Sequence, residues 1–94
     1  MAIDGELMPL VPEYLVNRHL DCDEIERLLA SGGMECIQGI GHRMKGSGGS
    51  FGFDEISAIG EELESAAQAS DAEVIRSSVE RLKSYLLRVS VTYI

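Results

Sequence analysis

The sequence predicts an all-α protein, an antiparallel up-down four-helix bundle with one or two short helical segments at its N-terminal side. Composition is the first reason, because two prolines and ten glycines stand among abundant Ala, Leu, Glu and Arg. The second is that apolar residues recur at steps of three and four along each long segment. The third is that the connections between these segments are short, which makes neighbouring helices antiparallel.

The length and charge of the chain limit its function. Its 94 residues suffice for one hydrophobic core, so we expect a single domain over residues 1–94, with 1–8 as a loose lead-in. The formal charge of −8 argues against binding nucleic acid or an anionic membrane surface, since both require clustered cations. No apolar run approaches the ~18 residues that span a bilayer, and no signal segment opens the chain. Cys22 and Cys36 lack the spacing of a disulfide framework, so we expect a cytoplasmic protein.

The N-terminal helical region is expected between Pro12 and Gly32. Proline suits the first turn of a helix because its φ is fixed near the helical value, and this first segment would end near His19. Asp21 or Asp23 could then cap a second short segment. One kinked helix and two separate helices fit the pattern equally well, so the sequence leaves both open.

The central helix is expected from about residue 34 to about residue 49, and its two faces differ. At 100° per residue, its inward face consists of apolar or small residues: Ile37, Ile40, Met44, Gly48 and Phe51. His42 lies on the opposite face and therefore points to solvent. The five glycines of this helix together cost about 4–5 kcal/mol of helix propensity relative to alanine. Tertiary packing therefore has to hold the helix together.

The glycines of the central helix divide between its faces. Gly41 and Gly48 fall on the inward side, where they would let a neighbouring helix approach closely. Gly46 and Gly49 fall on the outward side with His42, where no internal packing explains them. The outward pair suggests a surface that is kept clear for a partner.

Two further helices complete the predicted bundle. Asp54 could cap the third helix, whose inward positions are Ile56, Ile59, Leu63, Ala66 and Ala67. Gly60, in the same helix, offers another point of close contact. Ser70 and Glu73 have the form of a Ser-x-x-Glu capping box that would open the fourth helix. The inward stripe of the fourth helix is the most regular in the chain: Ile75, Val79, Leu82, Leu86 and Val89.

Motifs for nucleotide and metal binding do not fit the sequence. The run Lys45-Gly46-Ser47 lies inside a helical pattern and does not match a P-loop, and no glycine spacing completes a dinucleotide fingerprint. The candidate metal ligands are His19, Cys22, Cys36 and His42, but the spacing H-x2-C…C-x5-H is not a zinc-finger pattern. None of these motifs therefore indicates a nucleotide or metal site in this domain.

His42 is the strongest candidate for chemistry. From position alone it would be a solvated surface histidine, and Lys45 an ordinary surface charge. Together they indicate a reactive site, because neutral imidazole is a competent nucleophile near pH 7. Lys45, one turn further on, could neutralise the charge of a phosphoryl group on His42. Gly46 and Gly49 would leave room for a partner to bring its own phosphoryl donor within reach.

At these residues the chain resembles a known family. The run His42-Arg-Met-Lys45-Gly46-Ser47, followed by Gly52, is similar to the signature of histidine-containing phosphotransfer (HPt) domains, H-x-x-K-G-[small] with a glycine ten residues after the histidine. The resemblance extends to a preceding acidic helical hairpin and to the step Leu63-Glu64, and it covers essentially the whole chain. Gly41 stands where many members carry alanine. The entry Ser31-Gly-Gly-Met lacks the Gly-Asp that is frequent before the central helix.

The resemblance implies a function and a role for each residue. His42 would accept a phosphoryl group from the aspartyl phosphate of a receiver domain and pass it on reversibly, with Lys45 neutralising charge. Gly46 and Gly49 would provide clearance for the docked partner, and Glu64 could orient the imidazole through a hydrogen bond. The partners would be response-regulator receiver domains or a hybrid histidine kinase. The receiver would supply the Mg²⁺, so that the domain would need no metal ion and no cofactor of its own. The domain would be a monomeric carrier in a multistep phosphorelay, without kinase activity of its own.

Two other interpretations compete with this one. The dimerising domain of a histidine kinase resembles H-E-x-x-x-P, but here Arg43 follows His42, no proline lies nearby, and 94 residues leave no room for an ATP-binding domain. A purely structural helical adaptor would leave His42 a bystander, and the glycines would serve packing alone. Met1 favours a free-standing protein over a part of a hybrid kinase. The rest of the sequence does not distinguish between these two.

Overall fold

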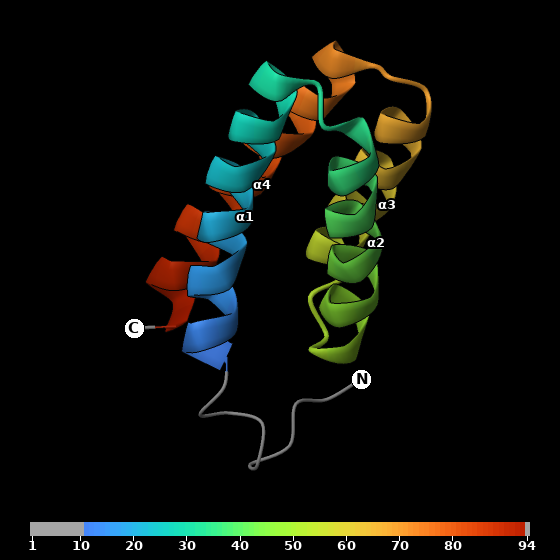
Figure 1. Ribbon diagram of the computed structural model, residues 1–94. Helices are drawn as coiled ribbons and strands as arrows, with labels where there is room; N and C mark the ends of the chain where they lie inside the picture. The colour runs from blue at the N-terminus through green and yellow to red at the C-terminus, as the bar shows by residue number, and fades with distance from the viewer. Residues whose placement is uncertain (1–10, 94) are drawn as a thin grey trace.

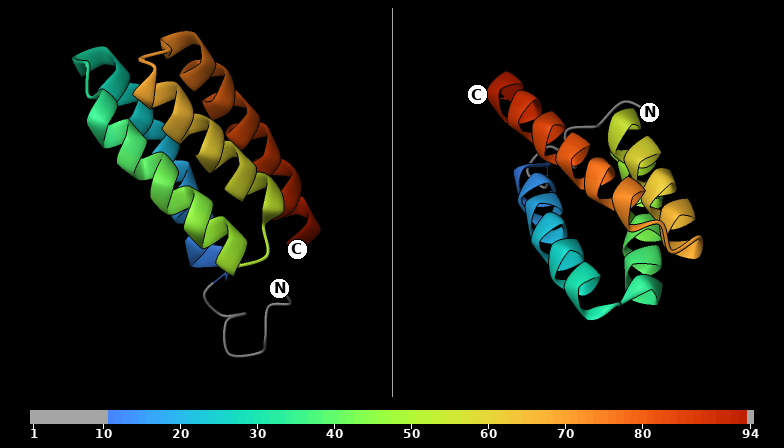
Figure 2. Two further views of the ribbon diagram at one scale, coloured as in Figure 1. Left: turned by 90° about the vertical axis from the view of Figure 1, so that its right-hand side faces the viewer. Right: turned by 90° about the horizontal axis from the view of Figure 1, so that it is seen from above.

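The computed structural model describes residues 11–93, with side chains through residue 89, so the lead-in expected at 1–8 lies outside the described residues. It contains four helices: α1 (Val11–Ser31), α2 (Met34–Ser50), α3 (Asp54–Gln68) and α4 (Ala72–Tyr93) (Figure 1). Successive helices run in opposite directions, and each packs against the two beside it in the order α1, α2, α3, α4 and back to α1 (Figure 2). The predicted all-α up-down bundle is confirmed.

The N-terminal region forms one continuous helix rather than short segments. Helix α1 has 21 residues, and neither glycine nor proline interrupts it after Pro12. Asp21 does not cap a new helix; its carboxylate accepts a hydrogen bond of 2.8 Å from Nε of Arg18, one turn earlier. Such pairs at i and i+3 support a continuous helix. The choice between one helix and two, which the sequence left open, is settled in favour of one.

The core lies between the four helices and is mainly aliphatic. The inward stripes predicted for α3 and α4 are buried, except for Val89, which is half-buried at the edge. Side chains with no exposed surface come from every helix: Val11, Ile25, Ile37, Ile56, Ile59, Leu63, Ile75, Leu82 and Leu86. Within residues 11–93, none of the helices is apolar over a stretch that could cross a membrane.

The helices are connected by tight turns of one kind. At Gly32 and Gly52 the backbone has φ of +79° and +81°, a region that glycine adopts without steric cost. The amide of the residue that follows each glycine donates to a carbonyl five residues earlier: Gly33 to Leu28 at 2.8 Å, and Phe53 to Gly48 at 2.7 Å. This is the Schellman motif, which satisfies carbonyls at a helix end and reverses the chain.

The caps predicted for the third and fourth helices are wrong in detail. Asp54 is the first residue of α3 rather than its cap, and Phe53 precedes it without a side-chain hydrogen bond. Ser70 does not open α4; it ends α3 with φ of +54° in a third Schellman turn, closed by a 2.8 Å hydrogen bond from the Asp71 amide to the Ala66 carbonyl. The cap of α4 is Asp71, whose Oδ1 accepts a hydrogen bond of 3.2 Å from the Val74 amide.

Three aromatic rings close the end of the bundle where α2 ends. The ring of Tyr14 stacks on Phe51 with centroids 4.4 Å apart and lies 5.9 Å from Phe53. Its hydroxyl is 2.9 Å from Oγ of Ser47, which ties α1 to α2. This cluster anchors the C-terminal half of α2, the helix that carries His42.

Candidate functional site

His42 projects from the middle of α2 into solvent. Its side chain is 73% exposed, whereas Ile40 and Met44 on the same helix are buried at 7% and 1%. The amphipathic pattern of α2 produces this orientation, because the apolar stripe turns toward α1 and α3. The predicted outward placement of His42 is confirmed.

The imidazole of His42 is held by a carboxylate from the neighbouring helix. Its Nδ1 lies 3.0 Å from Oε2 of Glu64 on α3. The Glu64 side chain is only 21% exposed, so its position is restricted by its surroundings. An ionised carboxylate is a hydrogen-bond acceptor only, so with Glu64 ionised Nδ1 is the donor, and in the neutral ring Nε2 then has the free lone pair. The hydrogen bond expected between these two residues is present.

The glycines of α2 divide between its faces as predicted. Gly41 and Gly48 are buried against α3, and Gly46 and Gly49 are exposed. A Cβ atom added at Gly46 would meet nothing within 4 Å, and one at Gly49 would meet only Oγ of Ser57, at 3.9 Å. Internal packing therefore does not require glycine at either outward position. The surface of α2 that follows His42 is consequently low and open.

Lys45 lies one turn after His42 and is half-exposed. Its ammonium group is 4.0 Å from Oε1 of Glu61 on α3, and its main-chain carbonyl accepts a hydrogen bond of 2.8 Å from Oγ of Ser57. Both contacts come from α3, as does Glu64. Sequence reasoning overlooked Ser57 and Glu61, since nothing in α3 alone shows which of its residues face His42 and Lys45.

A shallow hollow of about 310 Å³ surrounds His42 on the side of α2 nearer its start. Its lining comes from α2 and α3: Glu35, Gln38, Gly39, His42, Arg43 and Glu64. Glu35 and Gln38 precede His42 by seven and four residues, a spacing that places them on its face and that could have identified them. Arg43 adds a cation to this lining.

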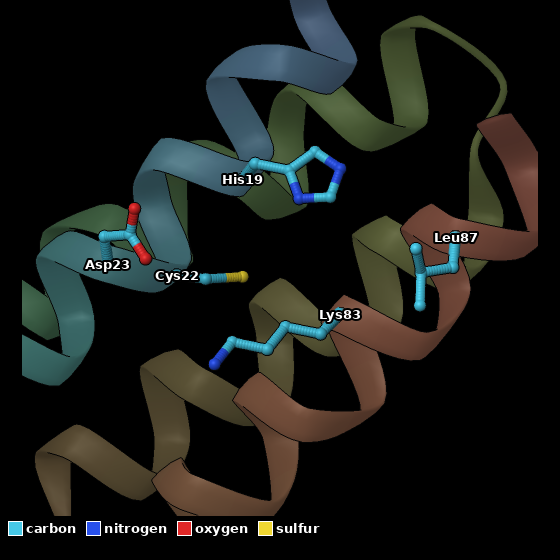
Figure 3. Close-up of a pocket in the computed structure, with 5 residues that line it drawn as sticks. All are labelled: His19, Cys22, Asp23, Lys83 and Leu87. Carbon is cyan, nitrogen blue, oxygen red and sulfur yellow. The ribbon is translucent and has the colours of Figure 1, made fainter.

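The second histidine lies in a different hollow, between α1 and α4. Figure 3 shows the ring of His19 and the sulfur of Cys22 directed into this space, opposite Lys83 and Leu87. The hollow measures about 290 Å³ and also includes Asp23. Burial raises the pKa of the Cys22 thiol to about 11, so it remains protonated near neutral pH.

The four candidate metal ligands do not converge. His19 and Cys22 face α4, whereas Cys36 is exposed on α2, the helix of His42. Among the described residues, no group of three or more His, Cys, Asp or Glu side chains is placed to hold a metal ion.

Comparison with known proteins assigns the chain to a family. A family model described as Hpt domain matches residues 13–91, which include all four helices almost to their ends. No curated protein and no solved structure shows a significant match. Domains of this family are phosphocarrier modules that lack kinase activity of their own and interact with receiver domains and histidine kinases. The chain therefore belongs to the Hpt domain family, and its general role is phosphotransfer in phosphorelay signalling.

Proposed function

We propose that His42 carries the phosphoryl group, accepting it from the aspartyl phosphate of a receiver domain and passing it on reversibly. The observation that supports this most directly is the hydrogen bond of 3.0 Å between Nδ1 of His42 and Oε2 of Glu64. It holds an imidazole that is 73% exposed, with Nε2 available to a partner. The contact therefore orients the ring while leaving it accessible.

This geometry supports the following course of transfer. The lone pair of Nε2 attacks the phosphorus atom, the N–P bond forms, and the P–O bond to the receiver aspartate breaks with its electron pair remaining on the carboxylate. The hydrogen on Nδ1 stays in place, and the positive charge that develops on the ring lies next to the Glu64 carboxylate. Transfer to the next receiver reverses these steps. Such reactions depend mainly on positioning and on neutralising the charge of the phosphoryl group.

The neighbouring residues have supporting roles in this proposal. Lys45 places a cation one turn from His42, where it would offset the charge of the bound phosphoryl group. Gly46 and Gly49 leave the adjoining surface open, so that the receiver can bring its aspartyl phosphate to the imidazole. The receiver supplies the Mg²⁺, and the Hpt domain needs no metal ion or nucleotide of its own.

We further propose that the domain works as a cytoplasmic monomer and cannot phosphorylate itself. The two cysteines, Cys22 and Cys36, are both free thiols, which fits a reducing compartment. Its partners would be response-regulator receiver domains, a hybrid histidine kinase or both, in line with the partners of the family.

The two histidines of the chain allow a matched test. Receiver domains labelled with radioactive phosphate are mixed with the wild-type protein, with His42→Gln and with His19→Gln. We expect the wild type and His19→Gln to acquire label that is stable in base and labile in acid, as a phosphohistidine is. His42→Gln should remain unlabelled, and ATP alone should label none of the three proteins.

Two results would contradict the proposal. If no receiver from the source organism labels the wild type, the domain is a helical adaptor in which His42 has no chemical role. If His42→Gln still acquires label, the phosphoryl group is carried by another residue.

A further inference from the structure

We propose that the contact between Gly41 and Gly60 determines which nitrogen of His42 reacts. The contact brings α3 so close to α2 that Glu64 reaches Nδ1, and Nε2 is thereby left as the nucleophile. Gly41 and Gly60 are then positioning residues, since they act through Glu64. The consequence for phosphotransfer depends on the function proposed above, but the state of the ring can be measured without any phosphoryl donor.

The main chains of α2 and α3 are closer here than they could be if either residue carried a Cβ atom. A Cβ atom at Gly60 would lie 2.7 Å from the Gly41 carbonyl oxygen and 2.9 Å from Cα of Lys45, and closer still to the Lys45 amide nitrogen. A Cβ at Gly41 would lie 2.6 Å from the Glu64 amide nitrogen and 2.8 Å from the Gly60 carbonyl oxygen. All of these atoms belong to helical main chain, which cannot rotate aside as a side chain can. Even alanine at either position therefore requires the helices to separate.

The position of this contact connects it to His42. Gly41 immediately precedes His42, and Gly60 lies one turn before Glu64. The separation of the main chains at this point therefore decides whether the Glu64 carboxylate reaches the imidazole. Moving the clashing atoms to an ordinary contact of about 3.5 Å would separate the helices by roughly 1 Å. That is enough to lengthen a hydrogen bond of 3.0 Å beyond its normal range.

The chemical effect concerns the position of one hydrogen. A free neutral histidine carries its hydrogen mainly on Nε2, which would remove the lone pair that attacks phosphorus. The Glu64 carboxylate accepts from Nδ1–H and so favours the opposite tautomer. Glycine at 41 and 60 is thus expected to increase the fraction of rings that are ready to react. Reactivity scales with the population of the competent state.

The test measures the tautomer directly by ¹⁵N NMR of the imidazole nitrogens at pH 8.5. It compares the wild type with Gly60→Ala, with Glu64→Ala and with the double variant. We expect the hydrogen on Nδ1 in the wild type and mainly on Nε2 in both single variants. The double variant should resemble Glu64→Ala, because Gly60 acts only through Glu64. His19 serves as the internal reference and should not change.

Gly48→Ala is the matched control. Its Cβ would lie 2.6 Å from the Ser57 amide nitrogen, so it strains the same pair of helices, but near Phe53 rather than near Glu64. It should leave the His42 tautomer as in the wild type while lowering stability in urea. If Gly48→Ala shifts the tautomer as much as Gly60→Ala does, general loosening explains the effect and the proposal is wrong.

The experiment measures the tautomer, the folding and the phosphotransfer of each variant independently. Circular dichroism checks each variant, and Gly41→Ala, which strains the contact from α2, replaces Gly60→Ala if the latter does not fold. A folded Gly60→Ala or Gly41→Ala protein with the wild-type tautomer would refute the proposal. That result would not contradict phosphotransfer by His42. Conversely, a failure of labelling would contradict phosphotransfer without affecting the measured tautomer. In folded variants the transfer rate should fall in proportion to the loss of the Nδ1–H tautomer.

Discussion

The ammonium group of Lys45 on α2 lies 4.0 Å from the carboxylate of Glu61 on α3. The Lys45 side chain is about half exposed, at 47%, and that of Glu61 is 65% exposed. An exposed pair of this kind contributes only about 0–1 kcal/mol, because water screens the charges. Lys45 can therefore leave Glu61 at little cost for the phosphoryl group proposed on His42, which would be a stronger partner.

The first prediction compares these two residues. Lys45→Ala should slow phosphoryl transfer to His42 by about ten- to a hundredfold, the equivalent of the roughly 1.5–3 kcal/mol of a charge-assisted hydrogen bond. Glu61→Gln should change the rate by less than about fivefold, since the exposed pair is weak. The measurement is the initial rate of labelling by a phosphorylated receiver. Lys83→Ala, on α4, is the control and should transfer normally; equal effects of the two lysine variants would contradict a local role for Lys45.

The second prediction concerns the open surface beside His42. Gly46→Leu and Gly49→Leu should slow transfer by obstructing the partner, while the fold is kept or stabilised by up to about 0.8 kcal/mol of helix propensity each. Labelling rates and circular dichroism melting curves test the two parts. Ser84→Leu places the same side chain on the exposed face of α4, the helix diagonal to α2. It should change neither the labelling rate nor the melting curve. Loss of the fold in the Gly46 or Gly49 variants would show that these glycines are needed for packing.

The third prediction concerns the turn between α3 and α4. Ser70 has φ of +54°, which is unfavourable for any residue with a Cβ atom. Ser70→Gly should therefore increase the free energy of unfolding by about 1 kcal/mol. Gly32→Ser, at a corresponding position with φ of +79° and open space around it, should lower that free energy by a similar amount. Urea unfolding followed by circular dichroism measures both, and a less stable Ser70→Gly protein would contradict the assigned turn.

The fourth prediction distinguishes the two thiols. The pKa of Cys22 is raised to about 11 because the side chain is buried, so at pH 8 it remains a protonated, shielded thiol. Cys36 is exposed on α2. A thiol reagent such as DTNB at pH 8 should therefore modify one cysteine in the folded protein and both in urea. Cys36→Ser should abolish the fast reaction, and two reactive thiols in the folded protein would contradict the burial of Cys22.

The outcome at particular residues shows where sequence reasoning succeeded. The faces of α2, α3 and α4 were predicted correctly, because the burial of positions such as Ile37, Ile59 and Leu82 follows from helical periodicity. Helix ends were predicted less well. Ser70 and Glu73 have the residue types of a capping box, but Ser70 lies in the turn that ends α3 and reverses the chain. Asp71, the next residue, caps α4.

The sequence by itself determined that the chain is helical, the inward faces of α2, α3 and α4 and the exposure of His42, together with the signature that indicates phosphotransfer. These properties depend on residues within one or two turns of each other, so a single segment encodes them. Only the tertiary structure decided that Glu64, Glu61 and Ser57 face α2, and how closely. That result depends on the separation and register of α2 and α3, which are set where Gly41 and Gly60 bring their main chains together. Contact between two helices is a property of the pair, and the periodicity of either helix alone does not contain it.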